Sequence, residues 1–430
     1  MPFAVVALST VLERLINVLI TPLLAKGLSK LDFGAITLSY AVSGILVLFV
    51  LNGLNSALFK ERSLWDDRYD FFSLEKKAIS ISFLCFLVVC MLGALNLLLD
   101  FSNATLGIDS FLFFTVIVST CSGFLFQLKS SVYASESRYF YLLAVSCLRF
   151  VIVAVLFWVF YENFLIFGRQ FGEFGFNLIF VCIFAITLQL SGMRNTPQIH
   201  TKTVQKDIKD LIFYGWSIQL SQIAFWVISS SDRLIIGALL GKLETAEYSI
   251  ATYLLIFSFL ISSFATVFSS LYFRMFRGKE NYDHVVSMII LAGSGCFLAA
   301  GILVNIFSNQ IILLISTKDY LNVSSYLVLS VYIMYSYFLY ICLSRGLHAL
   351  GKGKLILAST ASAALVNIVL NVFFIELYGA IFALYSSIIS YLLATILTMY
   401  FNFKNEISQK KTIISVAFSL MCATLLLGYV

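Results

Sequence analysis

Long apolar runs recur along the whole chain and constrain its fold more than any other feature. A run of about twenty apolar residues can cross a hydrocarbon core of roughly 30 Å as a helix. Only 12% of the 430 residues are charged, about half the share of a soluble domain. We place spans at 4–25, 36–58, 77–99, 110–128, 139–160, 174–193, 211–240, 245–273, 284–308, 323–344, 355–375 and 379–402, with a thirteenth run at 412–430. The sequence predicts an all-α polytopic membrane protein with twelve or thirteen transmembrane helices.

The basic residues are divided unequally between the two sets of loops. Loops after even-numbered spans hold twenty of the 28 Lys and Arg residues. Loops after odd-numbered spans hold five, namely Lys26, Lys30, Arg169, Lys242 and Lys318. Basic loops stay on the cytoplasmic side of a membrane. We therefore expect a cytoplasmic N-terminus and cytoplasmic even-numbered loops.

The chain also contains an internal repeat. The stretch ERLINVLITPLLAKGLSKLDFGAITLSY aligns with DRLIIGALLGKLETAEYSIATYLL, so that Glu13-Arg14 matches Asp232-Arg233. Both copies begin on the same side of the membrane, so the repeat is parallel, and a transport site is expected where two such halves meet. We expect six-helix bundles over 1–200 and 201–403 and an extra hydrophobic span over 404–430.

Each copy of the repeat carries an acid–arginine pair inside an apolar span. A charge at the centre of an inserted helix costs about 2.5–3.5 kcal/mol, so these side chains need polar partners or water within the bundle. Neighbouring residues do not face each other on a helix. We therefore expect Glu13 to pair with Arg233 and Asp232 to pair with Arg14. Arg149, in the middle of span 139–160, adds a third buried guanidinium.

Polar residues follow one face of two spans at helical spacing. One face comprises Gln219, Gln222, Trp226, Ser230 and Arg233, and the other comprises Thr10, Arg14, Asn17 and Thr21. Such faces line either a water-filled cavity or a packed seam between helices. We favour the seam for the Ser and Thr positions and the cavity for the arginines.

The charges of this expected cavity indicate the charge of its ligand. Three cations, Arg14, Arg149 and Arg233, stand against two carboxylates, Glu13 and Asp232. Arginine is always protonated and suits phosphate or carboxylate, so an anionic ligand is favoured. The carboxylates would bind a coupling ion, a proton or sodium, or hold the arginines when no substrate is present.

Two further groups of residues have a functional and a structural interpretation. Tyr332, Tyr335 and Tyr340 crowd one side of a span, where rings could stack on sugars, and Asn367 and Asn371 lie one turn apart on the next. Such residues more often serve packing and hydrogen bonds between helices. Both interpretations stay open at this point.

Other sites receive little support from the sequence. All eight cysteines fall inside predicted spans without a CxxC pair, and the three histidines have no ligand spacing. The run GLHALGKGK lacks the Ser or Thr of a phosphate-binding loop. We expect no catalytic residue, no metal site and no cofactor, apart from a coupling ion, and no nucleic-acid partner.

Three stretches resemble polysaccharide flippases of the Wzx type: TPLLAKGLSKLDFGAITLSYAV, DRLIIGALLGKLETAEYSIATYLL and ALVNIVLNVFFIELYGAIFALYSSIIS. These flippases belong to the exporter superfamily that includes multidrug and toxin extrusion (MATE) antiporters and the lipid II flippase. The resemblance implies a V-shaped bundle with a cationic lumen, alternating access and coupling to an ion gradient. It also implies translocation of a polyprenyl-diphosphate-linked oligosaccharide, such as an O-antigen repeat unit, to the periplasmic leaflet of the bacterial inner membrane. A polysaccharide polymerase and a chain-length regulator are the implied partners.

Two other functions remain open from the sequence. A cation or drug antiporter on the same scaffold would need an acidic lumen without fixed arginines. A membrane-embedded glycosyltransferase or polymerase would normally need a sizeable loop outside the membrane, and the predicted spans leave no such loop. A flippase is the function that the residues favour.

Overall fold

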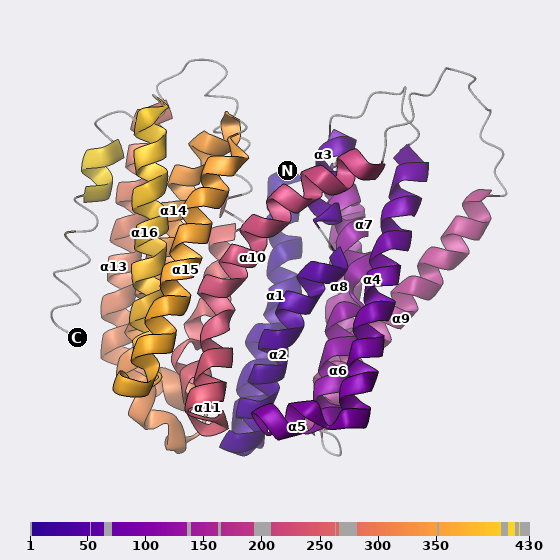
Figure 1. Cartoon of the computed structure of the whole chain (residues 1–430), viewed down its shortest axis with the longest axis horizontal. Helices are drawn as coiled ribbons and strands as arrows, with labels where there is room; N and C mark the ends of the chain where they lie inside the picture. The colour runs from indigo at the N-terminus through magenta and orange to yellow at the C-terminus, as the bar shows by residue number, and fades with distance from the viewer. Residues whose placement is uncertain are drawn as a thin grey trace. The chain divides into compact units, whose positions relative to one another are not determined.

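The computed structural model describes residues 2–51, 53–63, 71–135, 139–161, 165–192, 208–262, 264–265, 282–350, 352–405, 412–417 and 421. Within these ranges nearly all residues are helical (Figure 1). The first half contains α1 (Pro2–Gly27), α2 (Lys30–Leu51), α3 (Leu54–Ser63), α4 (Phe71–Leu99), α5 (Phe101–Leu106), α6 (Ser110–Cys121), α7 (Phe124–Ser135), α8 (Tyr139–Tyr161) and α9 (Leu165–Gly192). The second half contains α10 (Ile208–Leu239), α11 (Lys242–Ala251), η1 (Tyr253–Phe257), α13 (Tyr282–Ile315), η2 (Lys318–Tyr326), α14 (Leu327–Ala349), α15 (Gly353–Tyr378) and α16 (Phe382–Lys404). The predicted all-α fold is confirmed.

The lengths of these helices fit a chain that crosses a membrane many times. Eight described helices are long and apolar enough to span it, and the bent pair Lys242–Ala251 and Tyr253–Ser262 makes a ninth. Helices α1, α9 and α10 have 26, 28 and 32 residues and so exceed the roughly 20 residues that a span needs, but they carry charges. Within the described residues, each of the twelve predicted spans corresponds to a helix or to consecutive helices, and residues 266–273 of the eighth span lie outside them. Of the thirteenth, residues 412–417 are helical, and most of the remainder lies outside the described residues.

The chain divides into two compact units. Unit 1 consists of Met1–Ile16 and Ser39–Gln222, and unit 2 consists of Asn17–Leu38 and Ile223–Val430. The borders between the units fall inside α1, α2 and α10, so each of these helices belongs partly to both. The predicted bundle limits and the V-shaped arrangement stay predictions.

In unit 1, α9 packs against α6 and α8, and α4 packs against α6. The predicted span 110–128 is broken at Ser122 and Gly123, where α6 ends and α7 begins. A broken helix leaves carbonyl groups without hydrogen-bond partners. The side chain of Asn177 on α9 provides such a partner. Its Nδ2 donates to the Ser119 carbonyl at 3.2 Å and to Ser122 Oγ at 2.9 Å. The break is therefore held by a side chain from a neighbouring helix.

A second break in unit 1 separates α2 from α3. Gly53 there has a positive φ of 68°, a conformation that favours glycine. It also lies against α10, since a Cβ at Gly53 would be 2.2 Å from the Gly215 carbonyl oxygen. Gln219 Nε2 donates to the Leu48 carbonyl at 2.6 Å and so satisfies the end of α2. The predicted span 36–58 is thus two helices whose junction is closed by α10.

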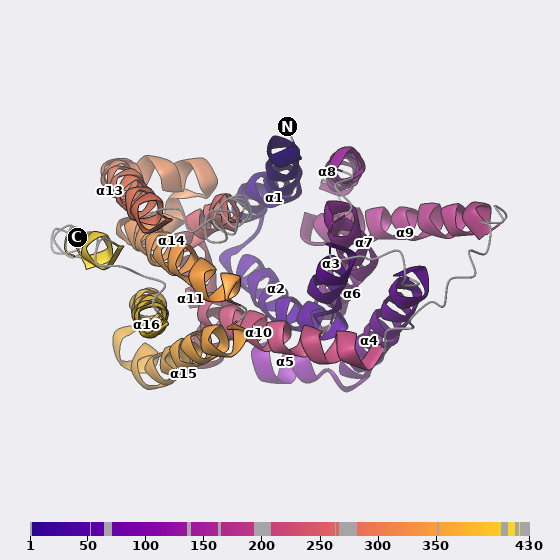
Figure 2. The same cartoon turned by 90° about the horizontal axis from the view of Figure 1, so that it is seen from above.

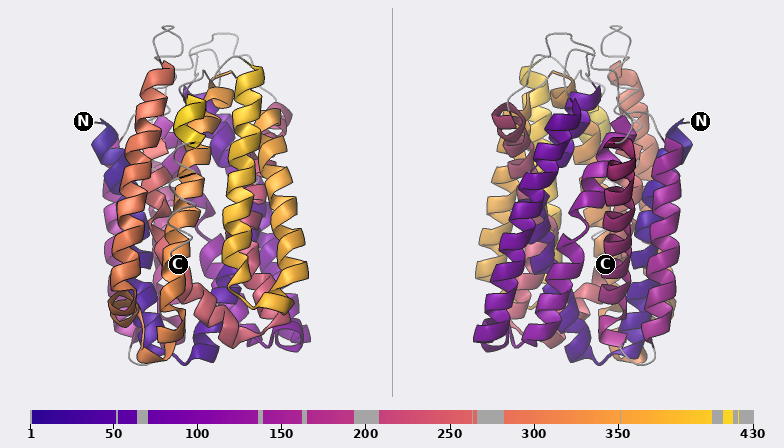
Figure 3. Two further views of the ribbon diagram at one scale, coloured as in Figure 1. Left: turned by 90° about the vertical axis from the view of Figure 1, so that its left-hand side faces the viewer. Right: turned by 90° about the vertical axis from the view of Figure 1, so that its right-hand side faces the viewer.

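In unit 2, α14 packs against both α13 and α16, and α15 packs against α16 (Figures 2 and 3). Helix α14 is the most enclosed helix of the unit, and most of its side chains are buried. This position explains why α14 carries several aromatic residues and few charges. A helix that faces other helices all round cannot present a lipid-facing surface.

One end of unit 2 joins the start of α2 to α11 and η2. Gly34 packs directly on α11, where a Cβ would lie 2.1 Å from the Lys242 carbonyl oxygen. Lys30 Nζ lies 2.7 Å from Glu247 Oε1, and Asn322 Nδ2 donates to Glu247 Oε2 at 2.8 Å. Three turns of the chain, α1–α2, α10–α11 and α13–η2, therefore share one end of the unit, as alternating spans require.

Candidate functional site

Among the charged residues of the predicted site whose side chains the structure describes, Asp232 of α10 is the most enclosed. It is only 1% exposed. Its Oδ1 accepts a hydrogen bond from Asn371 Nδ2 at 2.6 Å, and its Oδ2 accepts from Tyr248 Oη at 2.6 Å and from Ser387 Oγ at 2.8 Å. Burying a carboxylate is costly unless its oxygens are hydrogen-bonded. The three donors come from α11, α15 and α16, so four helices meet at this carboxylate.

The two predicted asparagines extend this network. Asn371 and Asn367 are fully buried and lie one turn apart on α15. Asn371 Nδ2 donates to Asn367 Oδ1 at 3.2 Å, and Asn367 Nδ2 donates to Ser386 Oγ at 3.2 Å. The second amide thereby orients the first toward Asp232. Within the described ranges, no group of three or more His, Cys, Asp or Glu residues is placed to hold a metal ion.

Arg233, the neighbour of Asp232 on α10, is half-buried. One of its terminal nitrogens donates to Thr252 Oγ1 at 3.2 Å, and Cζ lies 6.0 Å from the centre of the Tyr248 ring. A guanidinium has five N–H donors, so this contact leaves most of them for another partner. Among the described residues, no carboxylate forms an ion pair with Arg233.

Glu13 and Arg14 lie on α1, but their side chains are outside the described residues. The predicted ion pairs, Glu13 with Arg233 and Asp232 with Arg14, therefore stay predictions. The described partners of Asp232 are neutral hydroxyl and amide groups instead.

Arg149 of α8 lies in unit 1 among aromatic rings. Its Cζ is 4.9 Å from the centre of the Phe126 ring and 5.8 Å from that of Phe176. Both distances are within the range of cation–π attraction. Its Nε is buried without a hydrogen-bond partner. Aromatic rings therefore contact the cation, while its Nε has no hydrogen-bond partner.

The remaining residues of the predicted polar faces are distributed over both units. Gln219 lies in the helix junction described above, and Gln222 Nε2 is 3.5 Å from Ser56 Oγ on α3. Both glutamines therefore lie in a seam between helices in this structure. Trp226 Nε1 is buried without a partner. Asn17 is half-buried on α1.

The three predicted tyrosines are buried in contacts between helices. Tyr332 is 5% exposed, and Tyr335 and Tyr340 are 2% and 1% exposed. Tyr335 Oη lies 3.1 Å from Ser294 Oγ of α13, and the Tyr340 ring centre lies 5.2 Å from that of Phe225 on α10. In this structure these rings pack against protein.

The prediction that Arg169 lies in a loop is wrong. Helix α9 begins at Leu165 and contains Arg169. The run GRQFGEFG resembles a turn, but its glycines serve packing: a Cβ at Gly172 would lie 2.9 Å from the Val153 carbonyl oxygen of α8. Sequence reasoning missed a polar face on this helix, formed by Arg169, Gln170, Glu173 and Asn177. Their spacing of 1, 3 and 4 residues was the signal that could have revealed it.

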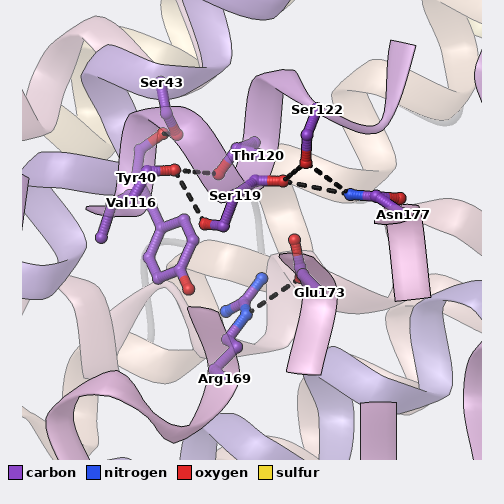
Figure 4. Close-up of polar contacts among 9 residues, drawn as sticks. All are labelled: Tyr40, Ser43, Val116, Ser119, Thr120, Ser122, Arg169, Glu173 and Asn177. Atoms are coloured by element: carbon purple, nitrogen blue, oxygen red, sulfur yellow. Dashed lines mark hydrogen bonds and ion pairs between the residues drawn. The ribbon is translucent and has the colours of Figure 1, made fainter. Parts of the chain in front are cut away.

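The α9 polar face contains an ion pair stacked on an aromatic ring (Figure 4). Arg169 Nε lies 3.3 Å from Glu173 Oε1. The Arg169 guanidinium also lies 4.0 Å from the centre of the Tyr40 ring of α2. Cation–π stacking and the ion pair together fix the guanidinium on two sides.

The fold is similar to the solved structures of several transporters. A lipid II flippase, MurJ, in an inward closed conformation matches with a TM-score of 0.70 and 17% identity, over 98% of this chain and 92% of that one. A multidrug resistance MATE family transporter in an inward-facing conformation matches with a TM-score of 0.70 and 14% identity, over 92% and 94%. A MOP superfamily transporter from Pyrococcus furiosus matches with a TM-score of 0.67 and 15% identity, over 94% and 95%.

The chain belongs to the family of polysaccharide biosynthesis proteins, whose family model matches residues 3–272. A second family model, MatE, matches residues 218–373. No curated protein matches the chain. The predicted superfamily and the multi-pass membrane fold are confirmed, and the matched structures are transporters and flippases rather than enzymes.

Proposed function

We propose that the protein is a flippase that moves a lipid-linked oligosaccharide across the bacterial inner membrane. One observation carries the proposal: a chain of the polysaccharide biosynthesis family has Arg149 and Arg233 inside long helices, and neither is paired with a carboxylate among the described residues. A guanidinium at membrane depth is costly. It is retained where it binds an anion, and the planar fork suits a diphosphate.

The mechanism follows from the chemistry of such a substrate. Arg149 and Arg233, with Arg14, bind the diphosphate, and the polyprenyl tail stays in lipid. Alternating access then moves the headgroup from the cytoplasmic to the periplasmic side, and no bond is made or broken. Asp232 and Glu13 bind the coupling ion, a proton or sodium. A polysaccharide polymerase and a chain-length regulator would receive the product.

The arginines provide the test. In cells that lack the chromosomal copy, Arg149→Ala and Arg233→Ala should each lower surface polysaccharide at least about tenfold at equal membrane abundance, because a lost charged hydrogen bond costs about 1.5–3 kcal/mol. Arg149→Lys and Arg233→Lys should restore part of the activity, since charge returns without the fork. Lys354→Ala, at an exposed position outside the predicted spans, is the matched control. Full activity of both alanine variants would remove the proposed anion site.

A second candidate is a MATE-like antiporter for cations or drugs. The MatE match over residues 218–373 includes Asp232 and two of its partners, Tyr248 and Asn371, and a buried carboxylate suits a cation. Deletion of the gene separates the two functions. An antiporter predicts drug-sensitive cells with normal polysaccharide, whereas a flippase predicts the loss of polysaccharide.

A further inference from the structure

The α9 polar face has properties that neither the diphosphate nor the coupling ion requires. Gln170, Glu173 and Asn177 are 3%, 8% and 4% exposed. The side chains of Arg169 and Glu173 keep 15% and 11% of their surface exposed. The cluster is therefore enclosed but accessible at its charged pair. Figure 4 shows the Tyr40 ring next to the Arg169 guanidinium of this pair.

The charges of this cluster cancel. Arg169 and Glu173 form an ion pair on one helix, so their side chains sum to zero formal charge. Arg149 and Arg233, by contrast, have no carboxylate partner among the described residues. An anion at the α9 polar face would meet the Glu173 carboxylate as well as the Arg169 guanidinium. The electrostatics therefore favour an uncharged ligand.

Several polar atoms of the cluster are buried without a hydrogen-bond partner. They are Tyr40 Oη, both amide atoms of Gln170 and Asn177 Oδ1. Asn177 has a structural role already, because its Nδ2 holds the break between α6 and α7. No such role accounts for Gln170, whose donor and acceptor are both unused. Buried polar groups in proteins nearly always have a hydrogen-bond partner. The unpaired atoms of Gln170 and Tyr40 therefore indicate that a ligand binds here.

Such a ligand must supply both hydrogen-bond donors and acceptors. The Gln170 amide needs one of each, and the Tyr40 hydroxyl accepts or donates. The Arg169–Glu173 pair, which shares the α9 polar face with Gln170 and packs on the Tyr40 ring, offers planar groups of both kinds. Vicinal hydroxyl groups of a sugar have this combination, and a site built for hydroxyls discriminates strongly against ligands that lack them.

We propose that the α9 polar face binds hydroxyl groups of an uncharged sugar in the transported headgroup. This inference rests on the proposed function and adds a contact to it. The arginines recognise the anionic part of the substrate, which all such substrates share, whereas Tyr40 and Gln170 recognise the sugar. With separate residues for the diphosphate and for the sugar, proteins of one family could transport different glycans that are all linked to the same diphosphate group.

Two nearly isosteric variants test the inference. Tyr40→Phe removes only the hydroxyl and keeps the ring under Arg169, and Gln170→Leu removes the amide. Binding of glucose, galactose, N-acetylglucosamine and inorganic diphosphate is measured by saturation-transfer NMR on the purified full chain. We expect each variant to weaken sugar binding about tenfold and to leave diphosphate binding unchanged. Phe174→Leu, at an exposed position on the same helix, is the control.

Other outcomes separate this inference from the proposed function. Equal sugar binding by both variants, or no sugar binding by the wild type, overturns the sugar site and leaves the flippase intact if diphosphate binding still depends on Arg149 and Arg233. If diphosphate binds equally well to Arg149→Ala and Arg233→Ala, the proposed function fails. Equal melting temperatures of Tyr40→Phe and the wild type exclude misfolding as the cause of weaker sugar binding.

Discussion

At the scale of single residues, Asp232 illustrates what a sequence can and cannot predict. A carboxylate in the middle of an apolar span was predictable as a group that needs polar partners, and Asn367 and Asn371 were predictable as a polar pair. Their contact was not, because helical spacing shows which residues share a face and not which helices meet. Tyr248 and Ser387 were missed for the same reason, since neither is unusual for its helix.

Removal of the Asp232 side chain should cost more stability than removal of its charge. Asp232→Ala leaves the Tyr248, Asn371 and Ser387 donors without an acceptor, at about 1–3 kcal/mol for each buried group. Asp232→Asn keeps one acceptor oxygen and should lie between wild type and alanine. The melting temperatures of the purified variants in detergent measure this order. A melting temperature of Asp232→Ala equal to that of wild type would contradict it, and Ser229→Ala, an exposed position on α10, is the control.

Arg169 is a residue whose location was predicted wrongly from the sequence. It lies between the predicted spans 139–160 and 174–193 and so was assigned to a loop. Its neighbourhood is also rich in glycine, which usually indicates a turn. Glycine also lets helices approach closely, and the contact between Gly172 and α8 shows that this use prevails. A local pattern cannot distinguish the two uses, because the difference depends on a helix far away in the sequence.

At the scale of helices, the number and order of the spans were predictable from hydropathy, but the breaks were not. Three predicted spans are each divided: 36–58, 110–128 and 245–273. Hydropathy stays high through a break, since the freed carbonyl groups are satisfied by side chains such as Asn177 and Gln219. These partners come from other helices and leave no mark in the local sequence.

Alanine substitutions of two glycines, one packed against a neighbouring helix and one in open space, should change stability in opposite directions. Gly34→Ala places a Cβ 2.1 Å from the Lys242 carbonyl oxygen, and such overpacking typically costs about 1–3 kcal/mol. Gly295→Ala on α13 meets nothing within 4 Å and should gain up to about 1 kcal/mol from helix propensity. Thermal unfolding of both variants tests the prediction. A stabilising Gly34→Ala would show that the two helices can separate at no cost.

The ion pair between Lys30 and Glu247 should contribute little to stability. The side chains are 24% and 19% exposed, and partly exposed pairs contribute about 0.2–1 kcal/mol. Lys30→Glu should destabilise slightly and Glu247→Lys more, because Glu247 also holds Asn322. The double variant should recover part of the lost stability, as measured by thermal unfolding of the wild type, both single variants and the double variant. Purely additive effects of the two substitutions would show that the pair is not coupled.

At the scale of the whole molecule, the repeat in the sequence has diverged in a way that matters for Asp232. With a gap of four residues, the alignment that places Glu13 over Asp232 places Phe33 over Tyr248. Phe33 has no hydroxyl, and it packs edge-on against Tyr320 at 6.4 Å. The first copy therefore lacks the donor that the second copy uses. The two carboxylates are matched in sequence, but the position matched to Tyr248 carries no hydroxyl group.

Membrane topology gives a prediction for the whole chain. The charge distribution predicts that the α13–η2 turn faces the periplasm and that the α14–α15 turn faces the cytoplasm. In a variant with its eight cysteines replaced, Asp319→Cys should react with a membrane-impermeant maleimide in intact spheroplasts. Lys352→Cys should react only after permeabilisation. Both positions are exposed in the structure, so a reversed labelling pattern would invert the topology.

The two oxygens of Asp232 would respond differently to an arriving proton. Oδ2 faces two hydroxyl groups, from Tyr248 and Ser387, and a hydroxyl can rotate and accept the bond that it had donated. Oδ1 faces the Asn371 amide, whose N–H groups have no such freedom. A proton on Oδ2 would thus be accommodated by rotation of an O–H bond, whereas a proton on Oδ1 would face the N–H group of Asn371.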